Sequence, residues 1–339
     1  MGSIGNTAAA VPEVALRFGN ARPIPAVGMG TAVSAPMNAV LAAIEVGFRH
    51  LDTAAMYGSE RSVGEAVAEA VRRGLLESRE EVFVTSKLWC TQCHPDLVVL
   101  SLRETLKRDL WPSCVDRASR NLQMEYLDLY LIHWPVCMKP GPIAFPAKKE
   151  DAVPFDFEGV WRAMEECQRL GLAKAIGVSN FTTKHLDKIL AFATIPPAVN
   201  QVELNPVWQQ RKLREYCADK GIHVVAYSPL GGQDWSRTGE GNGVLGSEVL
   251  EEIAQRRGKT IAQVSLRWIY EQGVTWIVKS FNKERLKQNL DIFEWKLTEE
   301  DRLKISQIPQ KKYVTAAVLF STEGEFNSVD PADMDIVEE

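Results

Sequence analysis

Eight short runs of apolar and β-branched residues recur along the chain, and segments with helical spacing separate them. The runs begin at residues 26, 48, 82, 126, 173, 198, 223 and 275. Most are apolar at nearly every position, which is typical of parallel strands that are covered on both faces. The pattern therefore predicts eight buried parallel strands.

The segments between the runs carry apolar residues three and four positions apart, as one face of a helix requires. Residues 38–48 place Val40, Ile44 and Phe48 on one such face. Residues 157–171 form a second helical pattern that stops at Gly171, and glycine favours the C-terminal end of a helix. Helices are therefore expected between the strands.

Strands that alternate with helices predict a parallel α/β fold, and eight such units predict a closed (β/α)8 TIM barrel. The alternative is a doubly wound Rossmann sheet, which requires a G-x-G-x-x-G motif after an early strand. The early sequence GMGTAV, residues 28–33, lacks the third glycine. The sequence therefore favours the barrel.

Three segments fall outside this repeat. Residues 13–25 read as an N-terminal hairpin that turns at Gly19-Asn20, and residues 231–246 form a long glycine-rich loop after the seventh strand. The polar, acidic C-terminal tail extends beyond the barrel. We expect one domain over residues 1–339, with its core at about 14–309 and a substrate loop at about 310–339.

Composition excludes several classes of protein. The chain has 339 residues, a net charge of −5, 45% hydrophobic and 24% charged residues, which argues against nucleic-acid binding. No apolar run reaches the ~18 residues of a membrane helix, and the first residues lack the pattern of a signal peptide. Six cysteines are too few for a disulfide scaffold. We expect a cytoplasmic protein with no membrane partner.

The sequence CTQCH at residues 90–94 matches three different cofactor or redox patterns. C-x-x-C-H is the spacing of covalent haem attachment, C-x-x-C is that of a redox pair, and the three side chains can ligate zinc. Zinc requires a fourth ligand, and haem attachment requires a maturation compartment for which the chain carries no signal. We expect no metal, and a redox-sensitive pair of Cys90 and Cys93 stays open.

Polar residues stand at the ends of several predicted strands, where barrel enzymes carry their chemistry. Asp52 and Lys87 end adjacent strands and are expected to form an ion pair, with Tyr57 and His133 beside them. A nearby ammonium lowers the pKa of a phenol and makes it a better proton donor, and a neutral histidine can orient a carbonyl oxygen. The alternative is a structural salt bridge beside a core histidine.

Several motifs together resemble those of the aldo-keto reductases. They are GFRHLDTAAMYGSE, KLW, YLDLYLIHWP, GVSNF, VNQVELNP, AYSPLG and VKSFNKERLKQN, in order between about residues 14 and 309. The resemblance implies a TIM barrel that reduces aldehydes or ketones with NADPH. It also implies a catalytic tetrad of Asp52, Tyr57, Lys87 and His133, with Tyr57 as the general acid.

The resemblance also implies how NADPH is held. Ser179, Asn180 and Gln201 would meet the nicotinamide carboxamide, and Tyr227 would stack on the ring. Lys279 and Arg285 look suited to the 2′-phosphate, because guanidinium groups make fork-like contacts with phosphate. The full set of implied cofactor-binding residues is Gly30, Thr31, Asp52, Ser179, Asn180, Gln201, Tyr227, Ser228, Leu230, Lys279, Ser280, Phe281, Arg285, Gln288 and Asn289.

The substrate is expected to be a small-molecule carbonyl in an apolar pocket lined by Met56, Trp89, His133 and Trp134. Much of the sequence resembles the plant branch of the family, which includes deoxymugineic acid synthases, codeinone reductases and chalcone reductases. This predicts reduction in plant specialised metabolism or in the synthesis of deoxymugineic-acid-type iron chelators. The alternative is an NADPH-binding regulatory subunit with little turnover. The family habit predicts a monomer.

Two segments depart from the family pattern. Residues 108–120 stand between the third helix and the fourth strand, and Pro112 prevents a simple extension of that helix. The insertion enters on the helix-to-strand side of the barrel, away from the chemistry, so we expect carbonyl reduction to survive its deletion. The C-terminal tail also departs, which leaves the physiological ketone open.

Overall fold

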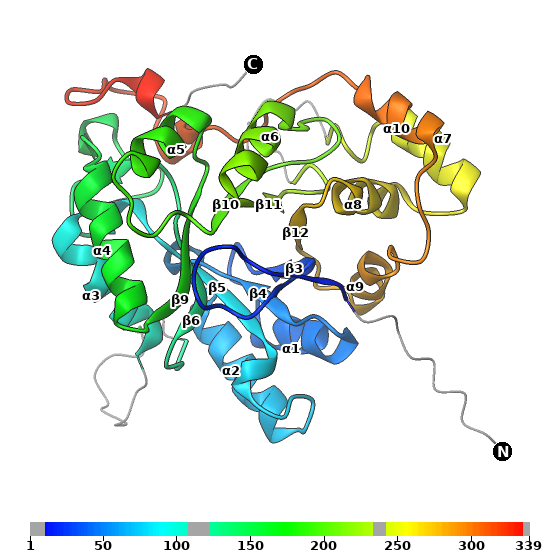
Figure 1. Ribbon diagram of the computed structural model, residues 1–339, viewed down its shortest axis with the longest axis horizontal. Coiled ribbons are helices and arrows are strands. Elements are labelled where there is room, and N and C mark those ends of the chain that lie inside the picture. Colours follow the sequence, from blue (N-terminus) through cyan, green and yellow to red (C-terminus); the bar gives the residue numbers. More distant parts are fainter. Residues whose placement is uncertain (1–10, 108–121, 233–241, 335–339) are drawn as a thin grey trace.

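Eight parallel strands close into one barrel at the centre of the molecule (Figure 1). The computed structural model describes residues 11–107, 122–232 and 242–334. Within the barrel, neighbours along the chain are neighbours in space, which confirms the predicted TIM barrel and excludes the doubly wound sheet. The strands are β3 (Val27–Gly30), β4 (His50–Asp52), β5 (Phe83–Leu88), β6 (Leu127–Ile132), β9 (Ala173–Ser179), β10 (Val199–Glu203), β11 (His223–Tyr227) and β12 (Thr275–Val278).

Helices surround the barrel (Figure 1). Their ends follow local signals: α3 begins at Pro95, and α5, α8 and α10 begin with capping boxes that pair orphan backbone N–H groups with side chains. The helices are α1 (Met37–Val46), α2 (Glu60–Arg72), α3 (Pro95–Leu106), α4 (Phe157–Arg169), α5 (Thr183–Leu190), α6 (Arg211–Lys220), α7 (Glu248–Arg257), α8 (Ile261–Glu271), α9 (Lys283–Leu290) and α10 (Glu299–Ser306).

One detail of the predicted helices is wrong. Helix α1 ends at Val46, because Gly47 adopts a left-handed conformation with φ of 111°. Phe48 therefore lies beyond the helix, although its side chain is fully buried. The predicted stop of α4 is confirmed, since Gly171 follows it with φ of 71°.

The two ends of the barrel differ in polarity. Inward-facing residues such as Phe83, Leu129 and Leu131 form an apolar cluster, against which Leu16 and Phe18 of the N-terminal hairpin pack. That hairpin pairs β1 (Glu13–Val14) with β2 (Ile24–Pro25), as predicted. The hairpin therefore packs on the apolar part of the interior, and the polar strand ends are left for chemistry.

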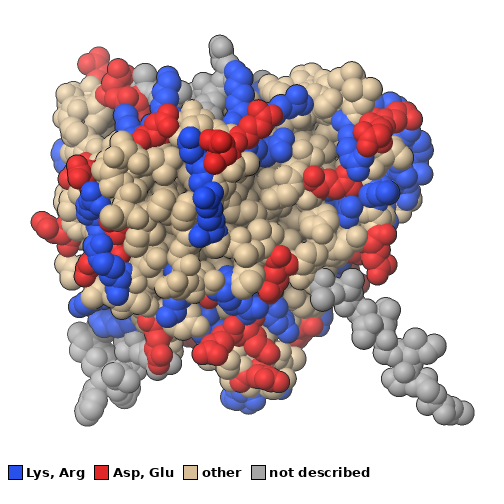
Figure 2. Space-filling view, viewed as in Figure 1, with Lys and Arg blue, Asp and Glu red and all other residues tan. Residues whose placement is uncertain are grey.

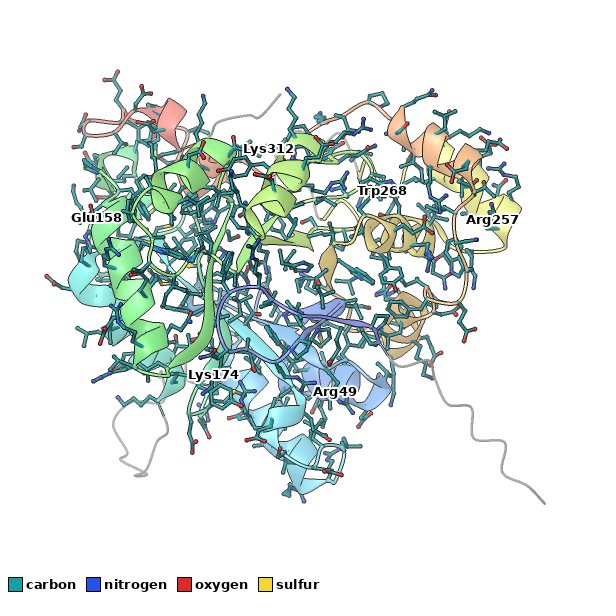
Figure 3. The ribbon with its side chains drawn as sticks, viewed as in Figure 1. Arg49, Glu158, Lys174, Arg257, Trp268 and Lys312 are labelled. Atoms are coloured by element: carbon teal, nitrogen blue, oxygen red, sulfur yellow. The ribbon has the colours of Figure 1, made fainter. Side chains whose placement is uncertain are left out.

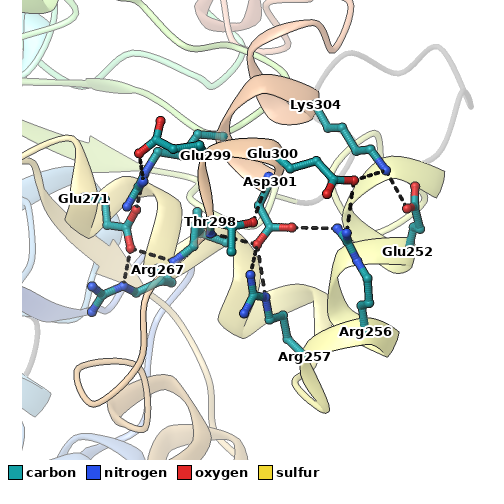
Figure 4. Close-up of polar contacts among 12 residues, drawn as sticks. Glu252, Arg256, Arg257, Arg267, Glu271, Thr298, Glu299, Glu300, Asp301 and Lys304 are labelled. Carbon is teal, nitrogen blue, oxygen red and sulfur yellow. Dashed lines mark hydrogen bonds and ion pairs between the residues drawn. The ribbon is translucent and has the colours of Figure 1, made fainter.

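A charged network fixes α10 against α7 and α8 (Figure 4). Asp301 is fully buried, and its two carboxylate oxygens accept hydrogen bonds from Arg256 and Arg257 at 2.6 Å each. The same carboxylate accepts from the backbone N–H of Thr298 at the start of α10. Because both carboxylate oxygens are satisfied, the buried charge is compensated.

The last described part of the chain forms a second, smaller core with the loops above the barrel. We call residues 313–334 the C-terminal segment, which Figure 1 shows beside α5. Its residues Val314, Leu319 and Phe320 pack with Trp134 and Met138. A short antiparallel pair, β7 (Cys137–Met138) and β8 (Ala152–Val153), belongs to the same region. The segment therefore contributes directly to the walls near the site.

The surface carries both signs of charge. On the face shown in Figure 2, acidic and basic side chains are interspersed, and both gather over α7 and α10. None of the helices in the described parts of the chain has the length and apolar character to cross a membrane. The predicted insertion at 108–120 and residues 233–241 of the long loop lie outside the described residues.

Candidate active site

The centre of the site is a buried ion pair between adjacent strands. Lys87 Nζ donates to Asp52 Oδ1 at 2.6 Å and to the backbone oxygen of Thr53 at 3.0 Å. The side chains of Lys87 and Asp52 are 1% and 4% exposed. The predicted ion pair is confirmed. Burial by itself lowers the pKa of Lys87, but Asp52 and Tyr57 outweigh burial and raise that pKa above its ordinary value.

The second oxygen of Asp52 is also occupied. Gln201 Nε2 donates to Asp52 Oδ2 at 2.8 Å. Gln201 lies on β10 and is nearly buried, so it reaches Asp52 through the barrel interior. One of the residues expected at the cofactor thus also orients the carboxylate that holds Lys87.

Tyr57 lies next to this pair on a short 3-10 turn, Ala55–Tyr57. Lys87 Nζ is 4.9 Å from the centre of the Tyr57 ring, and the Tyr57 hydroxyl is 3.4 Å from His133 Nε2. The expected lowering of its pKa is wrong: burial raises the pKa of Tyr57 above its ordinary value, and the opposing effect of Lys87 is smaller. Tyr57 is therefore a fully protonated phenol at neutral pH.

His133 is the second group that faces the same space. Burial, assisted by the charge of Lys87, holds the pKa of His133 well below its ordinary value, so the imidazole is neutral. The ring packs edge to face on Trp89 with the ring centres 5.2 Å apart. A neutral imidazole and a neutral phenol thus stand together above a buried ammonium, which is an arrangement that can bind and protonate one oxygen atom.

The residues expected around the nicotinamide also come together. Ser179 Oγ donates to the backbone oxygen of Gln201 at 2.8 Å, and Asn180 Nδ2 donates to that of His133 at 3.0 Å. The Tyr227 hydroxyl donates to Asn180 Oδ1 at 2.7 Å. Asn180 and Ser228 both have positive φ, at 63° and 48°. These contacts join β9, β10 and β11 into one polar rim.

Gly30 and Thr31, which are expected to contact the cofactor, lie at the end of β3. Thr31 Oγ1 donates to the backbone oxygen of Asp52 at 2.8 Å and lies 2.8 Å from Ser59 Oγ. A side chain at Gly30 would place its Cβ 2.8 Å from Ile277, so this position requires glycine for the close approach of β12. Gly30 thus has a structural reason for its identity, whatever its role toward a cofactor.

The basic residues around α9 divide into two groups. Lys283 pairs with Glu45 at 2.6 Å, and Lys287 pairs with Glu284 at 2.9 Å. Within the described ranges, no carboxylate lies within ion-pair distance of Lys279 or Arg285, and both side chains are exposed. Phe281, beside them, is 50% exposed. Lys279, before α9, and Arg285, within it, are thus exposed cations without an ion-pair partner among the described residues.

Three of the expected substrate residues line two separate hollows among the described residues. Met56 and Trp89 line a groove of about 780 Å³ that continues along Leu97 and Leu100 of α3. Trp134 instead lies beside Asn180 and Tyr227 in a smaller cavity of about 30 Å³. The larger groove is within the range of ordinary ligand sites, which is about 300–1,000 Å³.

The CTQCH stretch forms a short turn, Cys90–Gln92, directly after β5 and leads into α3. Burial raises the pKa of both Cys90 and Cys93 well above the ordinary value, which favours the unreactive thiol. The Nε2 atom of His94 lies 2.8 Å from the backbone oxygen of Met138. No cluster of side chains with metal-binding geometry is found among the described residues, and Cys114 lies outside them. The stretch forms a turn in which both cysteines are buried.

Glu203 is a residue to which the sequence reading gave no role. It lies at the end of β10, is 1% exposed, and accepts hydrogen bonds from the backbone N–H groups of Tyr313 and Val314. Its position at a strand end was visible in the sequence. Its partners were not, because they follow it by more than a hundred residues.

Glu203 also makes folding stability depend on pH. Burial raises the pKa of its carboxyl from 4.5 to about 7. The pKa of Glu203 is thus higher in the folded than in the unfolded chain. Such a group adds stability that is fully present at a pH below its unfolded pKa and is lost as the pH rises through its folded pKa. We expect Glu203→Gln to leave the free energy of unfolding almost unchanged at about pH 5 and to raise it by about 1–3 kcal/mol at about pH 8.

Urea unfolding at the two pH values measures this difference. Glu165→Gln is the control, because hydrogen bonds from Ile195 and Thr194 outweigh the effect of burial and hold the pKa of Glu165 below its ordinary value. That variant should gain no stability at the higher pH. An equal change for Glu203→Gln at both pH values would contradict the prediction.

A closed barrel with a buried lysine, a tyrosine and a histidine at the carboxyl ends of its strands defines a (β/α)8-barrel enzyme. Over residues 30–309 the chain matches the Aldo/keto reductase family. The protein therefore belongs to the aldo/keto reductase family and is an oxidoreductase, as the sequence motifs predicted.

Curated relatives and a solved structure agree with this assignment. Deoxymugineic acid synthase 1 of Oryza sativa subsp. japonica is 56% identical over 91% of this chain and 93% of that protein. The (1S)-1,7-diacetoxy-luvungin A aldo-keto reductase of Citrus sinensis is 53% identical over 95% and 97%. The aldose reductase of Schistosoma japonicum has a similar structure, with a TM-score of 0.78, 34% identity and coverage of 90% and 95%.

Proposed function

We propose that the protein reduces a ketone or aldehyde to an alcohol with NADPH, and that Tyr57 donates the proton. The observation that carries this proposal is the pair of neutral hydrogen-bonding groups, Tyr57 and His133, placed 3.4 Å apart beside a buried ammonium. Both groups can bind one carbonyl oxygen between them. When bound, NADPH supplies the hydride.

The proton comes from the Tyr57 hydroxyl. As charge develops on the carbonyl oxygen, Tyr57 protonates it and His133 keeps it in place through a hydrogen bond. The phenolate that remains lies next to the Lys87 ammonium, which stabilises it. Asp52 holds that ammonium through the 2.6 Å ion pair. Each member of the tetrad thus has one task, and only Tyr57 changes its covalent bonds.

Two features of the chain fit NADPH, and the second distinguishes it from NADH. The polar rim of Ser179, Asn180 and Gln201 offers hydroxyl and amide groups that match a carboxamide. At the other end, Lys279 and Arg285 are exposed and have no ion-pair partner among the described residues. The 2′-phosphate of NADPH would supply a negatively charged partner for these two cations, whereas NADH has no such phosphate.

Removal of Arg285 should therefore separate the two cofactors. We expect Arg285→Ala to weaken NADPH binding by roughly 10–100-fold, since a charge-assisted hydrogen bond contributes ~1.5–3 kcal/mol. NADH binding should change little. Titration of the protein with each cofactor, followed by protein fluorescence, measures the dissociation constants of NADPH and NADH. Lys287→Ala, whose ammonium already pairs with Glu284, is the control. Equal losses for both cofactors would remove the assignment of Arg285.

The substrate class is proposed from the relatives and the groove. Relatives named deoxymugineic acid synthase in rice and barley support a ketone reduced in iron-chelator synthesis, and the Citrus sinensis relative supports plant specialised metabolism. The groove beside Met56 and Trp89 supports a substrate with a sizeable body. NADPH oxidation with a panel of aldehydes and ketones tests the proposal directly. If no carbonyl in the panel supports oxidation, the proposed function fails.

A further inference from the structure

Glu203 lies at the carboxyl end of a barrel strand, on the same face as the tetrad, yet the proposed chemistry does not use it. Its Oε2 atom accepts both hydrogen bonds from the C-terminal segment, from Tyr313 N at 3.1 Å and from Val314 N at 2.8 Å. Its Oε1 atom is buried and has no hydrogen-bond partner among the described residues. Glu203 therefore holds the backbone of the segment through one carboxylate oxygen.

The part of the chain that Glu203 holds packs in one core with Trp134, and Trp89 packs against that core. Val314 and Leu319 pack in the same core as Trp134, and Glu203 shares the small cavity beside Asn180 with Trp134. Figure 3 places Lys312, the residue before the segment, near α5 and α6, away from Lys174 at the start of β9. Glu203 therefore acts at the entry of the segment, on the side of the site.

Further along, the segment is tied to the loop around Ala147. Ala147 N donates to Leu319 O at 2.8 Å, and Ser321 N donates to Ala147 O at 2.7 Å. Near the end of the segment, the backbone oxygen of Asp333 lies 2.9 Å from the Nε2 atom of His185. The later ties come from loops and a helix, whereas Glu203 belongs to the barrel itself. Glu203 thus ties the start of the segment to a barrel strand, two residues after Lys311 N donates to Val207 O at 2.7 Å.

We propose that Glu203 is a positioning residue for substrate selection: it fixes the C-terminal segment to the barrel and so sets the pocket wall that large substrates touch. This inference rests on the proposed carbonyl reduction. Substrates that reach the segment depend on Glu203, and compact substrates that occupy only the space at Tyr57 and His133 do not.

The test compares three variants of the full chain. Glu203→Ala removes both acceptor bonds, whereas Glu203→Gln keeps one carbonyl oxygen that can accept both. Glu165→Ala is the matched control, because the fully buried Glu165 also accepts from two consecutive N–H groups through one oxygen, those of Thr194 and Ile195. Those two residues lie in the connection from α5 to β10, on the side where barrel strands begin.

Steady-state kinetics with NADPH and two substrates, a small aromatic aldehyde and a bulky cyclic ketone, give the first readout. We expect Glu203→Ala to raise KM for the ketone by about ten-fold, as expected when a buried donor loses its partner, with kcat and the aldehyde KM almost unchanged. Glu203→Gln should behave as wild type, and Glu165→Ala should lower the melting temperature without changing selectivity. Equal kinetics for Glu203→Ala and Glu165→Ala, or a ketone defect in Glu203→Gln, would overturn the proposal.

Amide hydrogen exchange gives a readout that needs no turnover. The amides of Tyr313 and Val314 should exchange faster in Glu203→Ala than in wild type, and at wild-type rates in Glu165→Ala. If the wild-type protein reduces no carbonyl, the proposed function fails. Unchanged exchange in Glu203→Ala would separately overturn the positioning role of Glu203. If Glu203→Ala does not fold, Val314→Pro removes the 2.8 Å bond from the other side and should raise the same ketone KM.

Discussion

Tyr57→Phe is expected to lower kcat for carbonyl reduction by about 10²–10⁴-fold, the usual contribution of a positioned general acid. The variant keeps the ring and its packing but loses the hydroxyl that lies 3.4 Å from His133 Nε2. Binding of NADPH should change little, because the Tyr57 hydroxyl is not among the proposed cofactor contacts. Stopped-flow measurement of hydride transfer, together with cofactor titration, separates the two effects.

The pH profile gives a second check on the same residue. Because burial raises the pKa of Tyr57, its phenol stays protonated through neutral pH. The rate of reduction by the wild-type enzyme should therefore stay level until the pH exceeds ~10, the ordinary pKa of tyrosine, and fall beyond it. Tyr270→Phe on α8, which packs on Trp276 and Phe293, should retain full activity. Substantial activity in Tyr57→Phe would contradict the assigned proton donor.

Lys87→Met should have the largest effect on stability. It leaves Asp52 as a buried carboxylate without its 2.6 Å partner, and loss of one member of a buried pair costs about 3–5 kcal/mol. Activity should be lost as well, because the phenolate of Tyr57 would have no adjacent cation. Urea unfolding followed by circular dichroism measures the change in free energy.

A double variant distinguishes the lost pair from lost packing. Asp52→Asn combined with Lys87→Met removes the unpaired charge, so the double variant should be more stable than Lys87→Met alone. Lys287→Ala, at an exposed pair on α9, should cost less than about 1 kcal/mol. A double variant that is less stable than Lys87→Met would show that burial of the Asp52 charge does not dominate.

Local sequence determined the barrel. The eight apolar runs were each long enough for one covered strand, and the chain order of such strands has one simple closed solution, which the structure adopts. The same logic placed Asp52 and Lys87 at adjacent strand ends, and their ion pair followed. Strand ends and family motifs together predicted the roles of Tyr57 and His133. These features depend on spacing along the chain, which the sequence contains in full.

Quantities that depend on burial were decided by the tertiary structure. The sequence suggested that Lys87 lowers the pKa of Tyr57, but the sign is set by a competition between desolvation and a nearby charge. The sequence also could not tell that Lys283 has a partner in Glu45, far away in the chain, while Arg285 has none among the described residues. Both outcomes require the distances between segments that are remote in sequence.

The CTQCH stretch shows the same division. Its residues permit a haem, a metal or a redox pair, and the sequence alone fixed only its place after the third strand of the barrel. Packing buries Cys90 and Cys93, and this burial raises the pKa of both and so favours the thiol form. The sequence by itself thus determined the order of strands and predicted which groups carry the chemistry. The tertiary structure decided the partners of these groups and those of Glu203, and the burial that shifts their pKa values, because each depends on which segments remote in sequence pack around a group.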